Sequence, residues 1–223
     1  MVDWNNTSGN YSLIKEILGV PLGKITCLAE DKDGQVWIGT EEHGLFMLGL
    51  DKTAKRLSVE KENEINGNKI NTIFCDKSGI VWIGVATNGI DQLIPGKRFN
   101  RFSQNRNLPN TLSNNIVRCF IEDKDKNIWI ATQGGGINIF NRESQQFLSL
   151  TRKNVPGIPF DFIRYMVKED DETALIGTEK GMCRIKMSSH NTTPINFISV
   201  SGETLPPPYI EQIIPYQNGS WLI

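Results

Sequence analysis

The sequence predicts an all-β fold made of repeated four-stranded sheets, and three observations support this prediction. One pattern recurs through the 223 residues at steps of 45, 47, 46 and 46 residues. Each copy contains short apolar runs that are separated by turns rich in Asp and Gly, as antiparallel hairpins require. No long segment shows the 3.6-residue period of an amphipathic helix. Repeats of this length and character are typical of the blades of a β-propeller.

The copies are aligned by three columns of residues that keep one phase. The anchors of the repeat are Trp37, Trp82, Trp129, Leu175 and Trp221. Two positions after the anchor stand the small residues Gly39, Gly84, Ala131 and Gly177. Six positions before it stand the acidic residues Asp31, Asp76, Asp123 and Glu169. We interpret the Trp and Gly columns as structural: the large ring fills the wedge between blades, and the small residue lets sheets approach closely.

Each copy predicts four strands in order. In the first copy an apolar-rich run from residue 25 ends at the acidic column, and a tight turn follows at 32–34. A second strand carries the Trp-Ile-Gly-Thr element, and a glycine turn at 42–44 leads into a third. A weaker fourth strand follows in some copies, such as residues 146–150. In the third copy Lys126-Asn127 replaces the turn glycine, and we expect the Asn to tolerate the positive φ.

The repeat divides the chain into blades. We expect one propeller domain or propeller fragment over residues 1–223. Its full blades are predicted at about 21–65, 66–111, 112–158 and 159–204. Residues 1–20 resemble the end of a blade and residues 205–223 the start of one. Two interpretations remain: an internal fragment of a longer propeller, or ends that complete a shared fifth blade and close a ring. An unclosed array would expose sheet edges and favour association, for instance as a homodimer.

Composition excludes several classes of partner. The 24 Lys and Arg residues balance 25 Asp and Glu residues, so the chain has no general attraction for nucleic acid or anionic membranes. No run of 18 apolar residues is present, so no membrane segment is expected. The cysteines, which form no CxxC motif, are Cys27, Cys75, Cys119 and Cys183. We expect buried free thiols, with a disulfide pair as the alternative.

Motifs for catalysis or metal binding are not found in the sequence. The two histidines, His43 and His190, lie in polar loops without convergent metal ligands. Gly-x-Ser-x-Gly, His-Glu-x-x-His and Walker-type motifs are absent from the sequence. We therefore expect no catalytic residue, no metal and no cofactor in this chain.

The repeat resembles a known family. Its pattern, apolar-x-x-apolar-x-x-Asp-x-x-Gly-x-apolar-Trp-Ile-Gly-Thr followed by Gly-Gly-apolar, is similar to the two-component regulator propeller repeat. The third copy, with its lead-in at 108–117, is the most similar, and the fourth departs most, because Ala174-Leu175 replaces apolar-Trp. The resemblance covers residues 20–185 well and 205–223 weakly. It implies the periplasmic sensor region of a hybrid histidine kinase of the Bacteroidetes type, which responds to polysaccharide breakdown products. The implied partners are further blades or the kinase region of a parent chain.

A ligand site is expected where the loops of one face surround the mouth of the central channel. The second position of each inner strand is polar and holds Thr26, Asn71, Arg118 and Arg164. The matching loops supply Glu41, Asn88, Asn115, Gln133 and Asp161. Two arginines at such a mouth can pair with a carboxylate or sulfate on an acidic sugar. The alternative for each residue is a wet polar lining without a specific ligand.

The sequence thus favours a non-catalytic sensor propeller that binds an oligosaccharide. Two alternatives stay open. A propeller lyase or hydrolase acting on glycans would need a carboxylate pair, or a Tyr or His base, converging on the mouth. A protein-interaction scaffold would present a broad loop face without a pocket.

Overall fold

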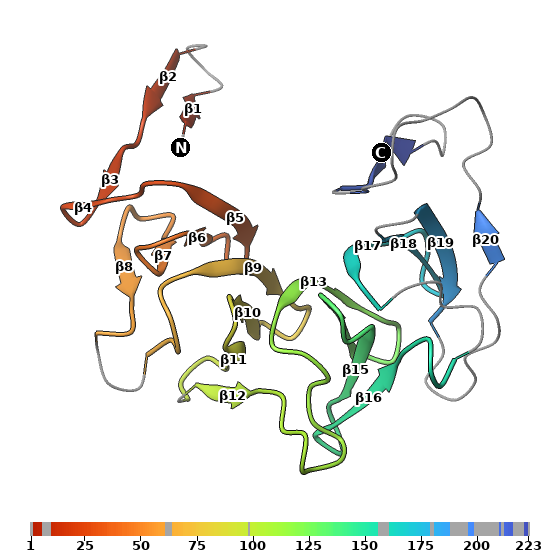
Figure 1. Cartoon of the computed structure of the whole chain (residues 1–223). Coiled ribbons are helices and arrows are strands. Elements are labelled where there is room, and N and C mark those ends of the chain that lie inside the picture. Colours follow the sequence, from red (N-terminus) through yellow and green to blue (C-terminus); the bar gives the residue numbers. More distant parts are fainter. Residues whose placement is uncertain are drawn as a thin grey trace. The chain divides into compact units, whose positions relative to one another are not determined.

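The computed structural model describes residues 2–5, 10–60, 64–97, 99–155, 161–178, 181–187, 196–198, 210, 212–215 and 221–222. His190 and the side chain of Trp221 lie outside the described part. Every regular element within these ranges is a β-strand (Figure 1). Nowhere in them is there a helix of the length and apolar character that a membrane crossing requires. The predicted all-β propeller class is confirmed.

Four four-stranded antiparallel sheets follow one another along the described chain, and in each the strands pair in sequence order. The first sheet consists of β5 (Ile25–Glu30), β6 (Val36–Thr40), β7 (Leu45–Leu48) and β8 (Ala54–Leu57). The second consists of β9 (Ile70–Cys75), β10 (Val81–Val85), β11 (Gly89–Leu93) and β12 (Asn100–Phe102). The third consists of β13 (Val117–Glu122), β14 (Ile128–Thr132), β15 (Ile137–Asn141) and β16 (Gln146–Leu150). The fourth consists of β17 (Ile163–Lys168), β18 (Thr173–Thr178), β19 (Gly181–Lys186) and β20 (Asn196–Ile198).

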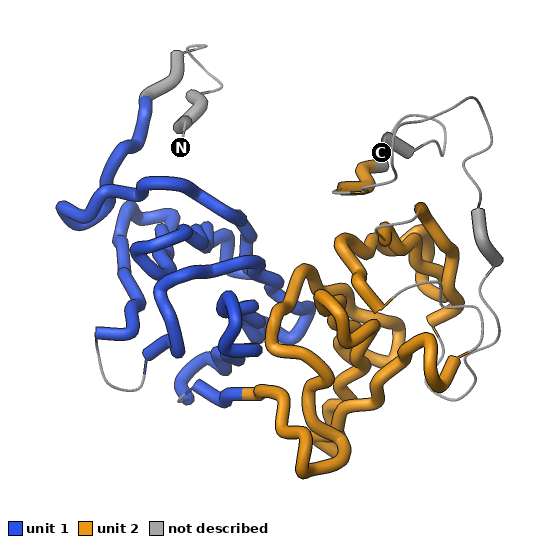
Figure 2. Tube along the Cα trace, in the orientation of Figure 1, with its two compact units in different colours: residues 1–101 blue, residues 102–223 orange. Residues whose placement is uncertain are grey.

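Shorter antiparallel pairs flank these sheets among the described residues. Near the N-terminus β1 (Val2–Asn5) pairs with β2 (Asn10–Leu13). A small hairpin of β3 (Glu16–Ile17) and β4 (Val20–Pro21) precedes the first sheet. Near the C-terminus β21 (Ile214–Pro215) pairs with β22 (Trp221–Leu222). The chain divides into two compact units, residues 1–101 and 102–223 (Figure 2).

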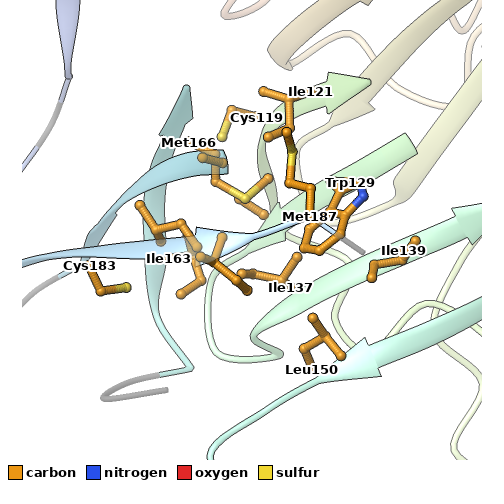
Figure 3. Close-up of a cluster of buried hydrophobic side chains, with 14 of the residues drawn as sticks. Cys119, Ile121, Trp129, Ile137, Ile139, Leu150, Ile163, Met166, Cys183 and Met187 are labelled. Atoms are coloured by element: carbon orange, nitrogen blue, oxygen red, sulfur yellow. The ribbon is translucent and has the colours of Figure 1, made fainter. Parts of the chain in front are cut away.

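The anchor column packs successive sheets together within each unit. In unit 1 Trp37 belongs to a buried cluster with Ile70 and Ile73 of the following sheet. A Cβ on Gly39 would lie 2.8 Å from Cγ2 of Ile70, so only a glycine allows this approach. In unit 2 Trp129 shares a cluster with Ile163 and Met166 of the following sheet (Figure 3). Ala131, which takes the place of the glycine, belongs to the same cluster. Trp37 and Trp129 thus each lie in a buried cluster that joins two successive sheets of one unit.

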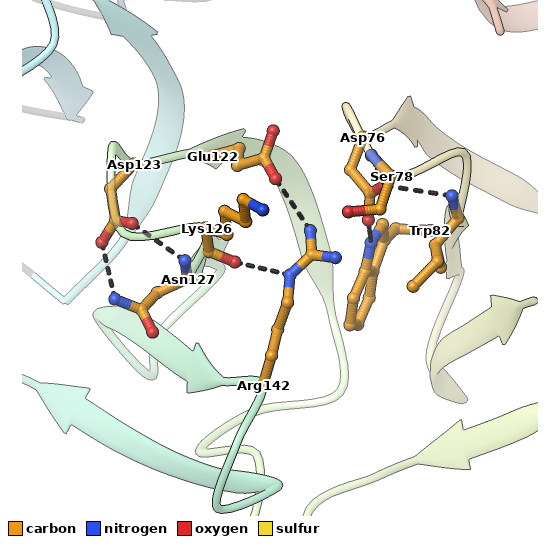
Figure 4. A network of polar contacts seen from close by, with 9 residues as sticks. Asp76, Ser78, Trp82, Glu122, Asp123, Lys126, Asn127 and Arg142 are labelled. Atoms are coloured by element: carbon orange, nitrogen blue, oxygen red, sulfur yellow. Dashed lines mark hydrogen bonds and ion pairs between the residues drawn. The ribbon is translucent and has the colours of Figure 1, made fainter. Parts of the chain in front are cut away.

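The acidic column is bonded to the Trp column. In unit 1 the indole Nε1 of Trp37 donates to Asp31 Oδ2 at 2.8 Å, and that of Trp82 donates to Asp76 Oδ2 at 2.7 Å (Figure 4). In unit 2 Trp129 donates to Asp123 at 2.9 Å. The other carboxylate oxygen caps the hairpin, as where Asp76 Oδ1 accepts from Ser78 N and Ile80 N. Each Asp therefore closes the turn and fixes the anchor ring together.

The fourth sheet replaces this bond with an ion pair. Its anchor is Leu175, which cannot donate, and Glu169 instead pairs with Arg184 of β19 at 2.5 Å. In the third sheet the left-handed turn position is Lys126, with φ of 65°, so the expectation that Asn127 would take it was wrong. Asn127 instead donates its amide Nδ2 to Asp123 Oδ2 at 2.9 Å.

One inner-strand position has different exposure in different sheets. Leu28 of β5 is 55% exposed, whereas its counterparts Ile73, Phe120 and Met166 are 8%, 6% and 3% exposed. In the other three sheets the residue at this position is buried. The face of β5 that carries Leu28 is not covered in this way by the described residues.

The four cysteines are free thiols, as predicted. Cys119 and Cys183 are buried, and Cys27 and Cys75 are half-buried. Burial raises the pKa of Cys27 to about 11 and that of the other three to about 12.

Candidate functional site

The four polar inner-strand residues occupy the same structural feature, a β-bulge. In β5 the register moves from Ile25 opposite Thr40 to Cys27 opposite Gly39, which leaves Thr26 as the extra residue. The same slip occurs in β9, β13 and β17. The extra residues there are Asn71, Arg118 and Arg164. Because all four are the extra residue of a bulge, these positions are equivalent in backbone geometry as well as in sequence. A bulge redirects a side chain and often lies next to a binding site.

In unit 1 both bulge residues bond neighbouring backbone. Thr26 Oγ1 donates to the carbonyl oxygen of Ile70 at 2.6 Å, which ties the first sheet to the start of the second. Asn71 Nδ2 donates to the carbonyl oxygen of Ala86 at 3.3 Å. These contacts give Thr26 and Asn71 a structural role at the end of the inner strands.

In unit 2 the bulge residues are the two arginines. Arg118 lies on β13 and Arg164 on β17, and these two inner strands lie side by side. Both side chains are half-buried. The structure therefore brings two guanidinium groups to equivalent places on adjacent strands of one compact unit.

The loop residues of unit 1 hold the approach to β9. Glu41 forms ion pairs with Lys24 at 3.0 Å and with Lys69 at 2.9 Å. Hydrogen bonds from Lys69 and then Lys24 lower the pKa of the Glu41 carboxyl. Since each lysine directly precedes an inner strand, Glu41 bridges the entries to two neighbouring sheets. Asn88 Nδ2 donates to the carbonyl oxygen of Asn66 at 2.5 Å, in the same lead-in.

The loop residues of unit 2 join the third sheet to the fourth. The carbonyl oxygen of Asp161 accepts from Gly134 N and Gly136 N at 2.9 Å each. Its Oδ1 accepts from Arg152 N at 2.8 Å. Gln133 forms a β-bridge with Phe162, so Gln133 and Asp161 lie at one edge. Asn115 Oδ1 accepts from Gln104 N at 2.6 Å, within the lead-in to β13.

The groups that a metal site would require do not gather in the described residues. There, no three side chains of His, Cys, Asp or Glu lie close enough together to hold an ion. His43 lies in the turn after β6, where its N–H donates to Thr40 Oγ1 at 3.0 Å. Its carbonyl oxygen accepts from Arg56 Nε at 2.9 Å.

Sequence reasoning missed a buried carboxyl in the second sheet. Asp91 on β11 is 1% exposed and accepts a hydrogen bond from Asn66 N at 2.5 Å. Arg101 Nε lies 3.7 Å from its other oxygen. Burial raises the pKa of Asp91 to about 6, against the smaller effects of the Asn66 bond and Arg101. The sequence does contain a signal for this buried polar position, because the third copy also has a polar residue there, Asn138. Its Oδ1 accepts from Ser113 N at 2.9 Å.

Comparison with known proteins supports the repeat assignment. Three segments, residues 19–42, 64–87 and 111–134, match the family model described as two component regulator propeller. The resemblance predicted from the sequence is confirmed for these three copies. A search of curated proteins gives no match.

Solved structures with the same fold come from several functional settings. One is the extracellular domain assigned to a hybrid two-component system of B. thetaiotaomicron, with 19% identity and a TM-score of 0.76 over 92% of this chain. Virginiamycin B lyase from Staphylococcus aureus has 17% identity and a TM-score of 0.63 over 83%. PorZ, a surface component of the type-IX secretion system of Porphyromonas gingivalis, has 18% identity and a TM-score of 0.62 over 80%. The chain spans 28%, 59% and 28% of these structures, respectively. At these identities the likeness establishes the fold alone.

Proposed function

We propose that this chain supplies non-catalytic propeller blades to the extracytoplasmic, periplasmic sensor region of a two-component receptor. The observation that carries the proposal is the match of three successive copies to the two component regulator propeller model. The fold shared with the extracellular domain of a B. thetaiotaomicron hybrid system supports it. A histidine kinase region and further blades of a parent chain are the proposed partners, and a homodimer is proposed as the assembly.

The blade boundaries proposed for this region are about 21–65, 66–111, 112–158 and 159–204. Each of the four-stranded sheets lies inside one of them. Residues 1–20 are proposed to form the end of a blade and residues 205–223 the start of one.

The proposed ligand is an oligosaccharide released from a polysaccharide. Its recognition is assigned to the bulge positions and to the loops that precede the inner strands and follow the second strands. Arg118 and Arg164 are proposed to bind an acidic group on the sugar, because guanidinium groups pair with carboxylate or sulfate through two parallel hydrogen bonds. A ligand switches such a receptor only through different affinities for its two states, so binding must depend on the arrangement of the blades.

The test measures binding of acidic oligosaccharide fractions to the chain by calorimetry, with cleavage followed in the same samples. Replacing Arg118 and Arg164 by Ala should weaken binding by about 10–100-fold, since a hydrogen bond to a charged group contributes about 1.5–3 kcal/mol. Arg106→Ala is the matched control, because Arg106 is exposed in another loop of the same unit. Equal affinity of the double variant and the control would contradict the assignment of the site. Cleavage of the sugar would favour a propeller enzyme instead.

A further inference from the structure

The third sheet carries a cavity of about 220 Å³ on the side of its outer strands. The polar side chains that line it are Asn110, Asn127, Asn141, Ser144 and Gln146. Apolar wall is supplied by Phe147 and Ile139, among others. All of these residues belong to unit 2. The volume is below the range of about 300–1,000 Å³ of drug-sized pockets, so the cavity suits one small ring.

The lining is polar but carries no charge. An amide offers two N–H donors and an acceptor oxygen, and a hydroxyl both donates and accepts. The amide side chains can therefore donate hydrogen bonds to ligand hydroxyls or accept hydrogen bonds from them. A charged ligand would find no counter-charge among the lining side chains. The lining chemistry therefore favours a neutral, hydroxyl-rich molecule with one apolar face.

The amides of buried Asn127 and half-buried Asn141 are held in place by hydrogen bonds. Asn127 is 3% exposed, and its Nδ2 donates to Asp123 Oδ2 at 2.9 Å (Figure 4). Asn141 Nδ2 donates to Asn127 Oδ1 at 3.0 Å, and Asn141 Oδ1 accepts from Ser144 N at 2.9 Å. Each amide nitrogen carries a second N–H. Such pre-organised groups lose little conformational freedom when a ligand binds.

The aromatic wall is equally fixed. Phe147 is 6% exposed, and its ring centroid lies 5.0 Å from that of Phe140 and 5.4 Å from that of Phe102. Tilted and edge contacts of this kind are favourable for aromatic pairs. The ring of Phe147 thus presents a defined apolar surface at the cavity.

The fold itself does not require these amides. In the second copy the positions equivalent to Asn127 and Asn141 are Ile80 and Ile94, which stand at the same distances from the Trp anchor and the turn glycine. Burying polar groups is unfavourable unless they are well bonded, and an apolar pair serves the same place in the other sheet. In the first copy Gln35 donates to Asp31 Oδ2 at 3.2 Å, so the bond of Asn127 to Asp123 is shared with that sheet. The partner amide Asn141 stands where the first two copies have Gly49 and Ile94, so it is the amide that those two sheets fold without.

We propose that this cavity binds a single neutral pyranose, with its hydroxyls on Asn110, Asn127 and Gln146 and its apolar face on Phe147. The inference rests on the proposed function for its biological meaning, because it adds a sugar subsite to a sugar sensor. It is separate from the loop-face site, which is assigned to an acidic group.

The experiment uses saturation-transfer difference NMR on the full chain with methyl glycosides of glucose, galactose, mannose and xylose as probes. At least one should receive saturation. Gln146→Ala and Asn110→Gly remove exposed side chains, and Gly suits the φ of 58° at Asn110. Each should weaken binding about 3–10-fold, as expected for the loss of one hydrogen bond. Asn107→Ala, which removes an exposed amide outside the cavity, should leave it unchanged.

The outcomes separate the two proposals. Absence of saturation for every glycoside, or unchanged binding in Gln146→Ala and Asn110→Gly, overturns the pyranose subsite. Tighter binding of galacturonic acid than of methyl galactoside overturns it too, because the lining has no cation. Loss of acidic oligosaccharide binding in the arginine variants, with no glycoside bound, would leave the proposed function standing without this subsite. Glycoside binding that survives in the arginine variants supports the subsite by itself.

Discussion

Replacement of Asp91 by Asn should stabilise the protein at neutral pH. Asp91 is almost fully buried on β11, and its carboxyl accepts the Asn66 N–H at 2.5 Å. An amide keeps an acceptor oxygen for that N–H and carries no charge. The third sheet already contains this solution, since Asn138 accepts from Ser113 N at the equivalent place.

The magnitude follows from the pKa of the buried carboxyl. Burial raises the pKa of Asp91 from 3.8 to about 6, so the folded state holds the proton more tightly than the unfolded state. Ionisation then destabilises the fold, by up to about 3 kcal/mol for a difference of about two pKa units. Arg101 is 49% exposed and 3.7 Å away, so its loss as an ion partner offsets only part of this gain. We expect Asp91→Asn to gain about 1–3 kcal/mol at pH 7.

The sign of the pH dependence is the sharper test. The contribution of Asp91 is fully favourable below about pH 4 and is lost as the pH rises through about 6. Urea unfolding at pH 4, 5, 6, 7 and 8 should therefore show the advantage of Asp91→Asn growing from near zero to its full value across this window. Asn138→Asp is the reciprocal control and should destabilise the third sheet at pH 7 more than at pH 4. If Asp91→Asn were more destabilising at pH 8 than at pH 4, the pair with Arg101 would outweigh burial and the reasoning would fail.

Three further predictions concern the packing of the sheets. Ile73→Ala should lower the free energy of unfolding by about 2–4 kcal/mol, whereas Leu28→Ala at the exposed equivalent position should change it by less than about 0.5 kcal/mol, as measured by urea unfolding. Gly39→Ala should destabilise by about 1–3 kcal/mol in thermal or urea unfolding, because the new Cβ would lie 2.8 Å from Ile70 Cγ2. The thiols of Cys119 and Cys183 should react with Ellman's reagent at pH 8 only when urea unfolds the chain, since burial raises their pKa to about 12 and thiolates are the reactive form.

The fold could be predicted because the repeat supplies its own alignment. With the Trp and Gly columns in one phase, each strand of the repeat can be recognised in four aligned copies. The packing of Trp37 and Trp129 between successive sheets could be inferred from the spacing of their column. The bulges could not be predicted in the same way. One extra residue in an inner strand leaves the column spacing unchanged, so only the register of the paired strands reveals that Thr26 and Arg118 are the inserted residues.

The cavity of the third sheet and the buried carboxyl of Asp91 could not be predicted from the sequence for a different reason. Asn110 and Asn127 stand in separate turns, and neither belongs to a repeat column. Asp91 stands on a strand whose alternation predicts a polar face, but a lead-in segment covers that face and bonds to it through Asn66. Both features depend on what the connecting loops cover, which periodicity does not report.

The four copies act as comparisons of one another, and they separate structure from function. Where the copies agree, the shared residues bond within the sheet, as the Asp–Trp pairs do, and the one departure is compensated locally: Leu175 loses the indole, and Glu169 turns to Arg184. At the bulges the copies disagree, with Thr26, Asn71, Arg118 and Arg164 in one backbone geometry. A fold that needed a particular side chain there would have one in every copy. The freedom of that position, set in a rigid frame, is what a ligand-binding surface requires, and it makes the arginines of unit 2 the first residues to replace.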